Sequence, residues 1–223
     1  MPSNKILARS LLIAAAGAVA AGCGTSPASQ SELAPIHSVF VKPIDEPRVR
    51  VVRTTEMYDV FDWTPSGTNV RFDELAAQKG LHPGAEIREA LTDAFRKHGY
   101  ATDTSSVAAD AVVEVKIEGM AYFVPPPGFA LFGSGCNPHA EFDITMRNTR
   151  TGSTILSHHY RFQTSGYAGV TGDMVFAADP KYVDVPCDSL WSEPQLPVDA
   201  FRSAIQQLAQ SVGNEVAKSG AGR

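Results

Sequence analysis

Basic residues are too scarce in this sequence for a protein that binds nucleic acid through its net charge. The 223 residues contain 19 Lys and Arg against 24 Asp and Glu, which gives a net charge of -5 at pH 7. Affinity for a phosphate backbone requires an excess of Lys and Arg. We therefore expect no nucleic-acid partner.

Long apolar segments and common catalytic motifs are also missing. After residue 30, no segment approaches the roughly 18 to 20 apolar residues that cross a bilayer as a helix. The patterns GxxxxGK[ST], GxGxxG, GxSxG and HExxH do not occur, which removes the common signatures of phosphate, dinucleotide, hydrolase and zinc-protease sites. Hydrophobic residues make up 43% of the chain and charged residues 19%, as is typical of one globular domain. We expect no cofactor and no enzymatic activity.

The first 22 residues have the pattern of a secretory signal peptide. Lys5 and Arg9 form a positive start, and residues 11–21 are apolar and rich in Ala. The segment ends in Ala-Ala-Gly followed by Cys23, which resembles a bacterial lipobox, where the cysteine thiol receives a diacylglycerol before cleavage. We expect residues 1–22 to be removed and Cys23 to be acylated, with palmitate among the chains. An ordinary cleaved signal and an uncleaved anchor helix are the alternatives.

Acylation of Cys23 predicts where the protein works. Each methylene of the two or three acyl chains adds ~0.8 kcal/mol of membrane affinity, so that attachment is stable. Gly24 stands where an Asp would resemble an inner-membrane retention signal, so we expect the periplasmic leaflet of the outer membrane. Residues 23–35 form an acylated flexible tether, 36–218 a single periplasmic domain and 219–223 a tail. Loss of Lys5 and Arg9 with the leader makes the mature net charge -7.

The cysteine count then predicts a disulfide. The chain has three cysteines, and lipidation of Cys23 leaves Cys136 and Cys187 in an oxidising compartment, where thiols tend to pair. A Cys136–Cys187 bridge closes a loop of about 50 residues, worth ~4 kcal/mol in the chain-entropy model. The alternative is a Cys-His nucleophile, because His139 follows Cys136 closely.

Hydrophobic periodicity predicts an α+β fold. Alternating apolar residues indicate strands, and a period of 3 to 4 residues indicates helices. Strands are expected at 37–42, 47–54, 111–124, 139–148 and 154–164, and helices at 86–98 and 201–216. Residues 55–80 and 165–197 are expected to be mostly loop. In 111–124, the inward side chains are predicted to be Val113, Val115, Ile117, Ala121 and Phe123. The result is a two-layer sandwich, an antiparallel or mixed sheet of about four to five strands with two helices on one face.

An apolar loop joins two of the predicted strands. Phe129, Leu131 and Phe132 follow three prolines and precede Cys136, and apolar residues in such a loop need a cover. The loop either folds back under the segment 165–197 or docks on a partner protein or lipid. We take Phe129, Leu131 and Phe132 as a candidate partner-docking loop.

Other polar patterns are candidate sites. His139, Glu141 and Asp143 share one face of a strand and could offer metal ligands, but a solvated charged face, cross-strand paired with Lys116, Arg147 or Arg161, is the interpretation adopted. We expect no metal and no catalytic residue. His158 and His159 should point to opposite faces, one packed and one wet. Two further patterns are expected to be exposed strand faces: a candidate anion-binding stripe of Arg48, Arg50 and Arg53, and a candidate acid/base pair of Glu114 and Glu118.

Three sequence segments resemble a known class of lipoprotein. They are Phe-Val-Lys-Pro at 40–43 with Asp45 and Arg48, the helix segment 87–100, and Ala109-Asp110-Ala111 opening the long strand. The arrangement resembles small bacterial outer-membrane lipoproteins of the lipopolysaccharide-assembly and ABC-transport-auxiliary type. The resemblance implies a non-enzymatic scaffold or accessory lipoprotein that acts through an envelope protein partner. The alternatives are a binding module for a small ligand or glycan, in a cleft lined by Tyr167, Tyr182 and Trp191, and an enzyme or metal protein centred on His139, Glu141 and Asp143.

Overall fold

The computed structural model describes residues 36–53, 69–102, 105–124, 135–163 and 174–218. The predicted leader, tether and tail lie outside these residues, and so do Cys23, Tyr167 and the docking residues Phe129, Leu131 and Phe132. Among the helices of the described part, none combines the length and the hydrophobicity that a bilayer-spanning segment needs.

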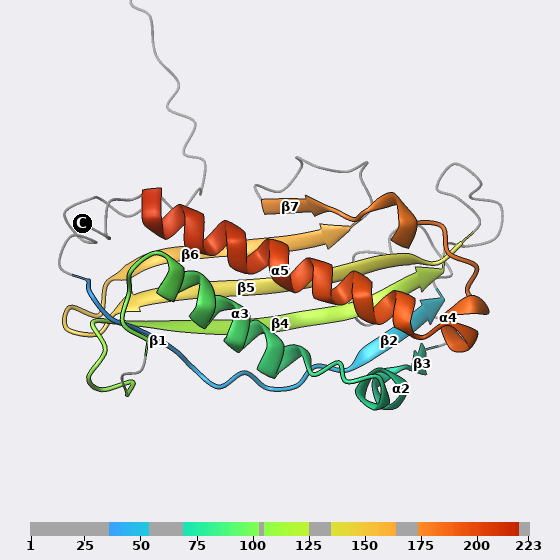
Figure 1. The fold of residues 1–223 in the computed structure, drawn as a ribbon, viewed down its shortest axis with the longest axis horizontal. Coiled ribbons are helices and arrows are strands. Elements are labelled where there is room, and N and C mark those ends of the chain that lie inside the picture. Colours follow the sequence, from blue (N-terminus) through green and yellow to red (C-terminus); the bar gives the residue numbers. More distant parts are fainter. Residues whose placement is uncertain (1–35, 54–68, 103–104, 125–134, 164–173, 219–223) are drawn as a thin grey trace, which may run out of the picture.

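Seven strands of the described residues form one mixed sheet (Figure 1). They are β1 (Val39–Val41), β2 (Val49–Arg53), β3 (Asn69–Arg71), β4 (Ala111–Val124), β5 (Asn137–Asn148), β6 (Thr154–Gln163) and β7 (Met174–Ala177). The order is β3-β2-β4-β5-β6-β7, with β1 also paired to β4. β1 and β2 run parallel to β4, and β7 runs parallel to β6, whereas the other neighbours are antiparallel.

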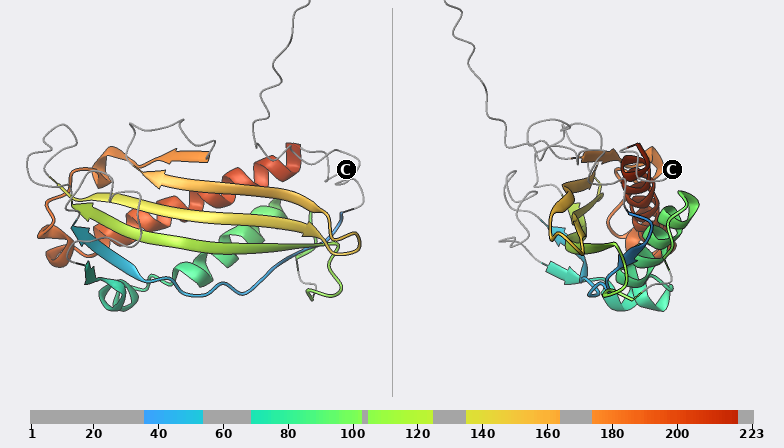
Figure 2. Two further views of the ribbon diagram at one scale, coloured as in Figure 1. Left: turned by 180° about the vertical axis from the view of Figure 1, so that it is seen from behind. Right: turned by 90° about the vertical axis from the view of Figure 1, so that its left-hand side faces the viewer.

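The helices of the described residues are α2 (Asp73–Gln78), α3 (Pro83–Lys97), α4 (Ser189–Ser192) and α5 (Gln195–Lys218), with a short 3-10 helix, η3, at Pro180–Tyr182. The two long helices, α3 and α5, lie over the same face of the sheet (Figure 2). The predicted two-layer α+β sandwich is confirmed, but the predicted counts of strands and helices are too low. β3 and β7 have three and four residues, and α2 and α4 have six and four, which is too short for a periodic pattern to show in the sequence.

Helix α3 forms where its periodicity predicts and begins three residues earlier. Pro83 occupies its first turn, and the carboxylate of Glu46 accepts hydrogen bonds from the N–H groups of Gly84 and Ala85, at 3.0 and 3.2 Å. These groups have no partner inside the helix, so Glu46 acts as a cap supplied from outside it. Gly84 is needed there, because a Cβ would lie 2.7 Å from the carbonyl oxygen of Ile44.

The core lies between this helix layer and the sheet. The buried stripe of α3 consists of Ile87, Leu91 and Phe95. Helix α5 buries every predicted apolar position: Phe201, Ala204, Ile205, Leu208, Val212 and Val216. At Gly213, a Cβ would come within 3.2 Å of Ala94 on α3, so this glycine lets the two helices approach closely.

Strand β4 contains an irregularity that corrects one sequence prediction. Its register with β5 shifts between Ile117 and Gly119. Such a bulge exchanges the two faces of the strand beyond it. Tyr122 therefore faces the helices, with its ring 5.8 Å from that of Phe201, whereas Phe123 lies on the other face, 5.3 Å from the ring of His139. The prediction that Ala121 and Phe123 point inward with Val113 is wrong for this reason.

The domain has two distinct ends. β1 and the C-terminal end of α5 lie at one end, which we call the base (Figure 1, left). α2 and α4 lie at the opposite end, which we call the tip. Strand β4 spans most of the distance between them, and its 14 residues extend about 45 Å at roughly 3.3 Å per residue.

Candidate functional site

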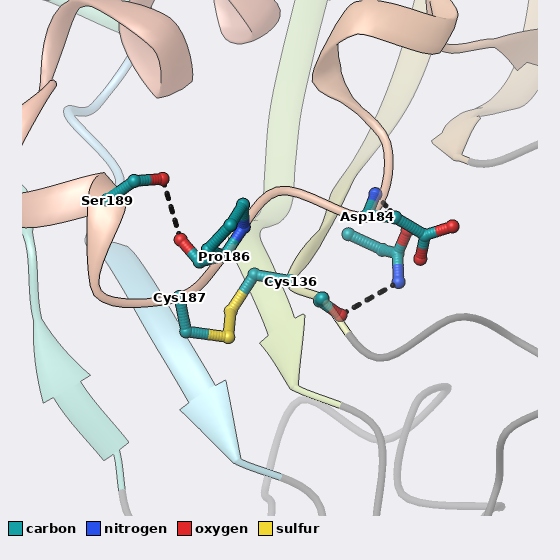
Figure 3. Close-up of a disulfide and its surroundings, with 7 residues drawn as sticks. Cys136, Asp184, Pro186, Cys187 and Ser189 are labelled. Atoms are coloured by element: carbon teal, nitrogen blue, oxygen red, sulfur yellow. Dashed lines mark hydrogen bonds between the residues drawn. A yellow bond between two sulfur atoms is a disulfide. The ribbon is translucent and has the colours of Figure 1, made fainter.

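A disulfide joins Cys136 to Cys187 at the tip, as the cysteine count predicts (Figure 3). Their Cα atoms are 5.2 Å apart. The N–H of Cys136 donates to the carbonyl of Val185 at 2.7 Å, and the N–H of Val185 donates back at 3.2 Å. The segment before α4 is thereby fastened to the start of β5. Because Cys136 is bonded to Cys187, it offers no thiol, and the Cys-His nucleophile considered above is wrong.

The backbone beside the disulfide admits little change. Asn137 donates from its amide to the carbonyl of Gly135 at 3.2 Å and accepts from the N–H of Asp184 at 3.2 Å. Asp184 has a positive φ of 56°, which is unusual for a residue other than glycine. A Cβ at position 135 would lie 2.2 Å from the carbonyl carbon of Asp184, so only glycine fits there.

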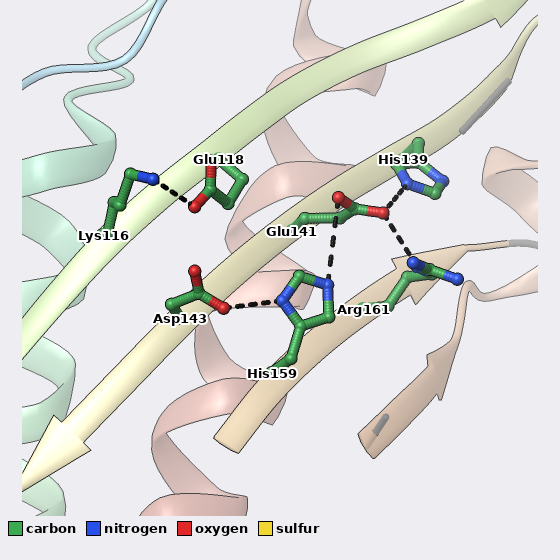
Figure 4. Close-up of polar contacts among 7 residues, drawn as sticks. All are labelled: Lys116, Glu118, His139, Glu141, Asp143, His159 and Arg161. Atoms are coloured by element: carbon green, nitrogen blue, oxygen red, sulfur yellow. Dashed lines mark hydrogen bonds and ion pairs between the residues drawn. The ribbon is translucent and has the colours of Figure 1, made fainter. Parts of the chain in front are cut away.

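An ion-pair network lies on the sheet face opposite the helices (Figure 4). Oε1 of Glu141 accepts a hydrogen bond from Nε of Arg161 at 2.8 Å and lies 2.9 Å from Nε2 of His139. Oε2 of Glu141 is 3.9 Å from Nε2 of His159, and Nδ1 of His159 is 2.7 Å from Oδ1 of Asp143. Five side chains of β5 and β6 are thus connected through Glu141. We call them the outer-face network.

Burial distinguishes this network from the solvated face that the sequence suggested. His139 is 3% exposed and Glu141 5%. The cross-strand pairing predicted for this face is present, since Glu141 lies directly opposite Arg161 and Asp143 opposite His159. The prediction of a fully solvated face is wrong at His139 and Glu141. In the part of the chain that the structure describes, no three His, Cys, Asp or Glu side chains are placed to hold a metal ion together.

Burial lowers the pKa of His139, although its hydrogen bond to Glu141 acts in the opposite direction. In the unfolded chain this histidine has its ordinary pKa of about 6.5, so the unfolded state binds a proton first as the pH falls below that value. Protonation of the unfolded state then lowers the free energy of unfolding by at most about 1.4 kcal/mol per pH unit. We expect the stabilisation from neutral His139 to be complete above this pH and to decrease below it. Urea unfolding at about pH 7.5 and 5.5 should show a smaller pH effect in His139→Gln than in the unmodified protein. His82→Gln, at an exposed histidine, serves as the control, and an equal pH effect in all three proteins would contradict the assignment.

His158 and His159 lie on opposite faces, as predicted. His158 faces α5, with Nε2 2.6 Å from Oε1 of Glu215, whereas His159 belongs to the outer-face network. Their side chains are 23% and 28% exposed, so the expectation of one packed and one wet histidine is wrong. Each is half-buried and bound to a carboxylate.

The remaining polar candidates do not converge on one site. Glu114 pairs with Lys42, and a hydrogen bond from this lysine lowers the pKa of the carboxyl group, which is the wrong direction for a general acid. Glu118 pairs with Lys116. Of the three arginines, Arg48 and Arg50 are described, and the side chain of Arg53 lies outside the described residues.

A pocket of about 330 Å³ opens beside α2 at the tip. Its apolar floor includes Val49, Ala76 and Leu81, which are buried. The charged and titratable residues that line it are Glu46, Arg48, Asp73, Glu74 and His82. This lining differs from the predicted cleft. Tyr182 is buried, and Trp191, which is 42% exposed, is not among the lining residues. The pocket combines three separate sequence segments, and no local motif marks it.

Comparisons with known proteins leave the family of this chain open. No protein-family model matches it, and no curated protein matches it. Solved structures similar to parts of it include a Xanthomonas campestris protein of the family DUF330, 10% identical with a TM-score of 0.46, covering 82% of this chain and 85% of that one. A candidate lipoprotein from Caulobacter crescentus is 12% identical with a TM-score of 0.36, covering 63% and 85%. The PelC dodecamer from Paraburkholderia phytofirmans is 13% identical with a TM-score of 0.36, covering 83% and 93%. None of these scores reaches one half, so these likenesses support no conclusion about function.

Proposed function

We propose that this chain is an envelope lipoprotein, anchored through Cys23 in the periplasmic leaflet of the outer membrane, that acts as a non-enzymatic scaffold or accessory factor by protein-protein contact. The Cys136–Cys187 disulfide carries the proposal. Stable disulfides form in oxidising compartments such as the periplasm. The bridge also accounts for two of the three cysteines and leaves Cys23, at the end of the leader, for acylation.

The two-ended shape of the domain fits such an anchor. The tether 23–35 precedes β1 in the sequence, and β1 lies at the base (Figure 1). The tip lies at the other end of β4, about 45 Å away at roughly 3.3 Å per residue. An anchored domain would therefore hold its base toward the membrane and present its tip to partners in the periplasm. β4 ends and β5 begins at the tip (Figure 1).

Acylation of Cys23 is directly testable in cells fed an alkyne analogue of palmitate. We expect the full-length protein to be labelled and Cys23→Ser to remain unlabelled, because only the thiol of this residue accepts the diacylglycerol. The double variant Cys136→Ser/Cys187→Ser is the matched control and should keep its label. Mass spectrometry should find Cys23 at the N-terminus of the mature chain. Separation of the inner and outer membranes by density should find the protein in the outer membrane. A mature chain that begins elsewhere, or carries no acyl chain, would overturn the proposal.

A further inference from the structure

Acidic residues are concentrated in the segment that forms the tip. Between Lys181 and Arg202 the sequence contains no Lys or Arg but four acids, Asp184, Asp188, Glu193 and Asp199. α2 begins with two more, Asp73 and Glu74. The segment between Lys181 and Arg202 thus carries four negative charges and no positive charge from Lys or Arg.

One large aromatic side chain is exposed among these acids. Trp191, on α4, is 42% exposed and stands between Asp188 and Glu193 in the sequence, both of which are exposed. Its ring lies 5.3 Å from that of Phe72, the residue that precedes α2. Trp is enriched among the residues that dominate binding energy at protein interfaces.

The residues that follow Phe72 line the pocket. Asp73 and Glu74, which follow Phe72, line it together with Ala77. Trp191 therefore packs against the residue that directly precedes the pocket-lining part of α2. The pocket has a volume of about 330 Å³, near the lower limit for ligand pockets. This volume is enough for one or two side chains with an aliphatic stem.

The charges that line the pocket favour a cationic guest. Three carboxylates, those of Glu46, Asp73 and Glu74, line the pocket together with one guanidinium, that of Arg48, and the imidazole of His82. Glu46 is engaged with the N-terminus of α3, whereas Glu74 is exposed at the rim. Long Lys and Arg side chains bury their methylene groups on apolar surface and keep the charged head near carboxylates or over an aromatic ring.

We propose that this tip surface, the pocket with Trp191, Asp188 and Glu193, binds a segment of a partner protein in which Lys or Arg alternates with apolar side chains. The inference rests on the proposed function, because it names the kind of partner that the domain contacts. The apolar stems occupy the pocket above Val49, Ala76 and Leu81, and the cationic groups lie near the carboxylates and the indole. The outer-face network lies on the opposite side of the sheet from α3 and α5 and takes no part in this contact.

The probe is the peptide acetyl-Lys-Leu-Lys-Leu-Lys-amide, added to the mature acylated protein in neutral detergent. The chain has two tryptophans, so Trp63→Phe makes Trp191 the only indole reporter. We expect a saturable change in Trp191 fluorescence that weakens as salt is added, because salt screens exposed charges. The peptide acetyl-Glu-Leu-Glu-Leu-Glu-amide should give no such change.

Matched variants test the surface. Glu74→Lys and Glu193→Lys should each weaken binding of the basic peptide by about tenfold. Glu89→Lys changes the net charge equally on the exposed side of α3 and should bind as the parent does. Ala77→Leu fills the pocket and should weaken binding, whereas Gln78→Leu, at the next exposed position of α2, should not.

Absence of a saturable response, or equal weakening by Glu74→Lys and Glu89→Lys, would overturn the inference. Its failure is distinguishable from that of the proposed function. A chain that is acylated at Cys23 but does not bind the peptide contradicts only the tip surface. A chain that binds the peptide but carries no acyl group contradicts only the anchor.

Discussion

Replacing both Cys136 and Cys187 by serine is expected to lower the free energy of unfolding by ~4 kcal/mol. The bridge closes a loop with a sequence separation of 51 residues, and removing it restores that loop's freedom to the unfolded chain. For a domain of this size, the melting temperature should fall by roughly 8 to 16 °C. Urea unfolding measured with and without a reductant checks the result, because reduction of the unmodified protein should reproduce the variant.

The control for this prediction uses a cysteine outside the bridge. Cys23→Ser should leave the stability of the domain unchanged, since it closes no loop. If the double variant unfolded at the same urea concentration as the oxidised parent, the hydrogen bonds between Cys136 and Val185 would suffice to hold the tip, and the bridge would be redundant for stability.

Sequence periodicity predicted the long elements of this fold well. The predicted strand 111–124 coincides with β4, because apolar and polar residues alternate over much of its length. The helices α3 and α5 were predicted because their apolar residues recur every three to four positions over several turns. The bulge in β4 was missed. Its one signal is Gly119, since a glycine inside a strand often marks a bulge, but a glycine does not say on which side the register shifts.

The missed bulge explains why the burial of the outer-face network was not predicted. With an unbroken alternation, Ala121 and Phe123 would face the helices, and Met120 and Tyr122 would lie on the opposite face. The shifted register moves Phe123 onto that face, next to His139. Cross-strand pairing of Glu141 with Arg161 was predictable from residue types, because opposite charges favour such positions. How deeply the pair is buried depends on the register of β4, which its own pattern does not fix.

Neutralising Glu141 is expected to destabilise the domain by about 3 to 5 kcal/mol. Its carboxylate is buried and binds Nε of Arg161, whose side chain is 15% exposed. Glu141→Gln neutralises this carboxylate while the guanidinium stays charged, and removing one partner of a buried ion pair costs more than the pair contributes. The measurement is equilibrium unfolding in urea, with fluorescence and circular dichroism followed together.

Glu118→Gln is the matched control, because Glu118 lies on the neighbouring strand β4 and pairs with the exposed Lys116. Exposed ion pairs contribute about 0 to 1 kcal/mol, so this variant should remain close to the parent. Arg161→Met combined with Glu141→Leu removes both charges and should recover much of the loss, since two apolar side chains leave no charge of this pair uncompensated. If Glu141→Gln and Glu118→Gln lowered the free energy of unfolding equally, the carboxylate of Glu141 would be in contact with water. The network would then contribute no more to stability than an ordinary surface ion pair. Recovery by the double variant would instead assign the cost to the charge of Arg161 rather than to lost packing at Glu141.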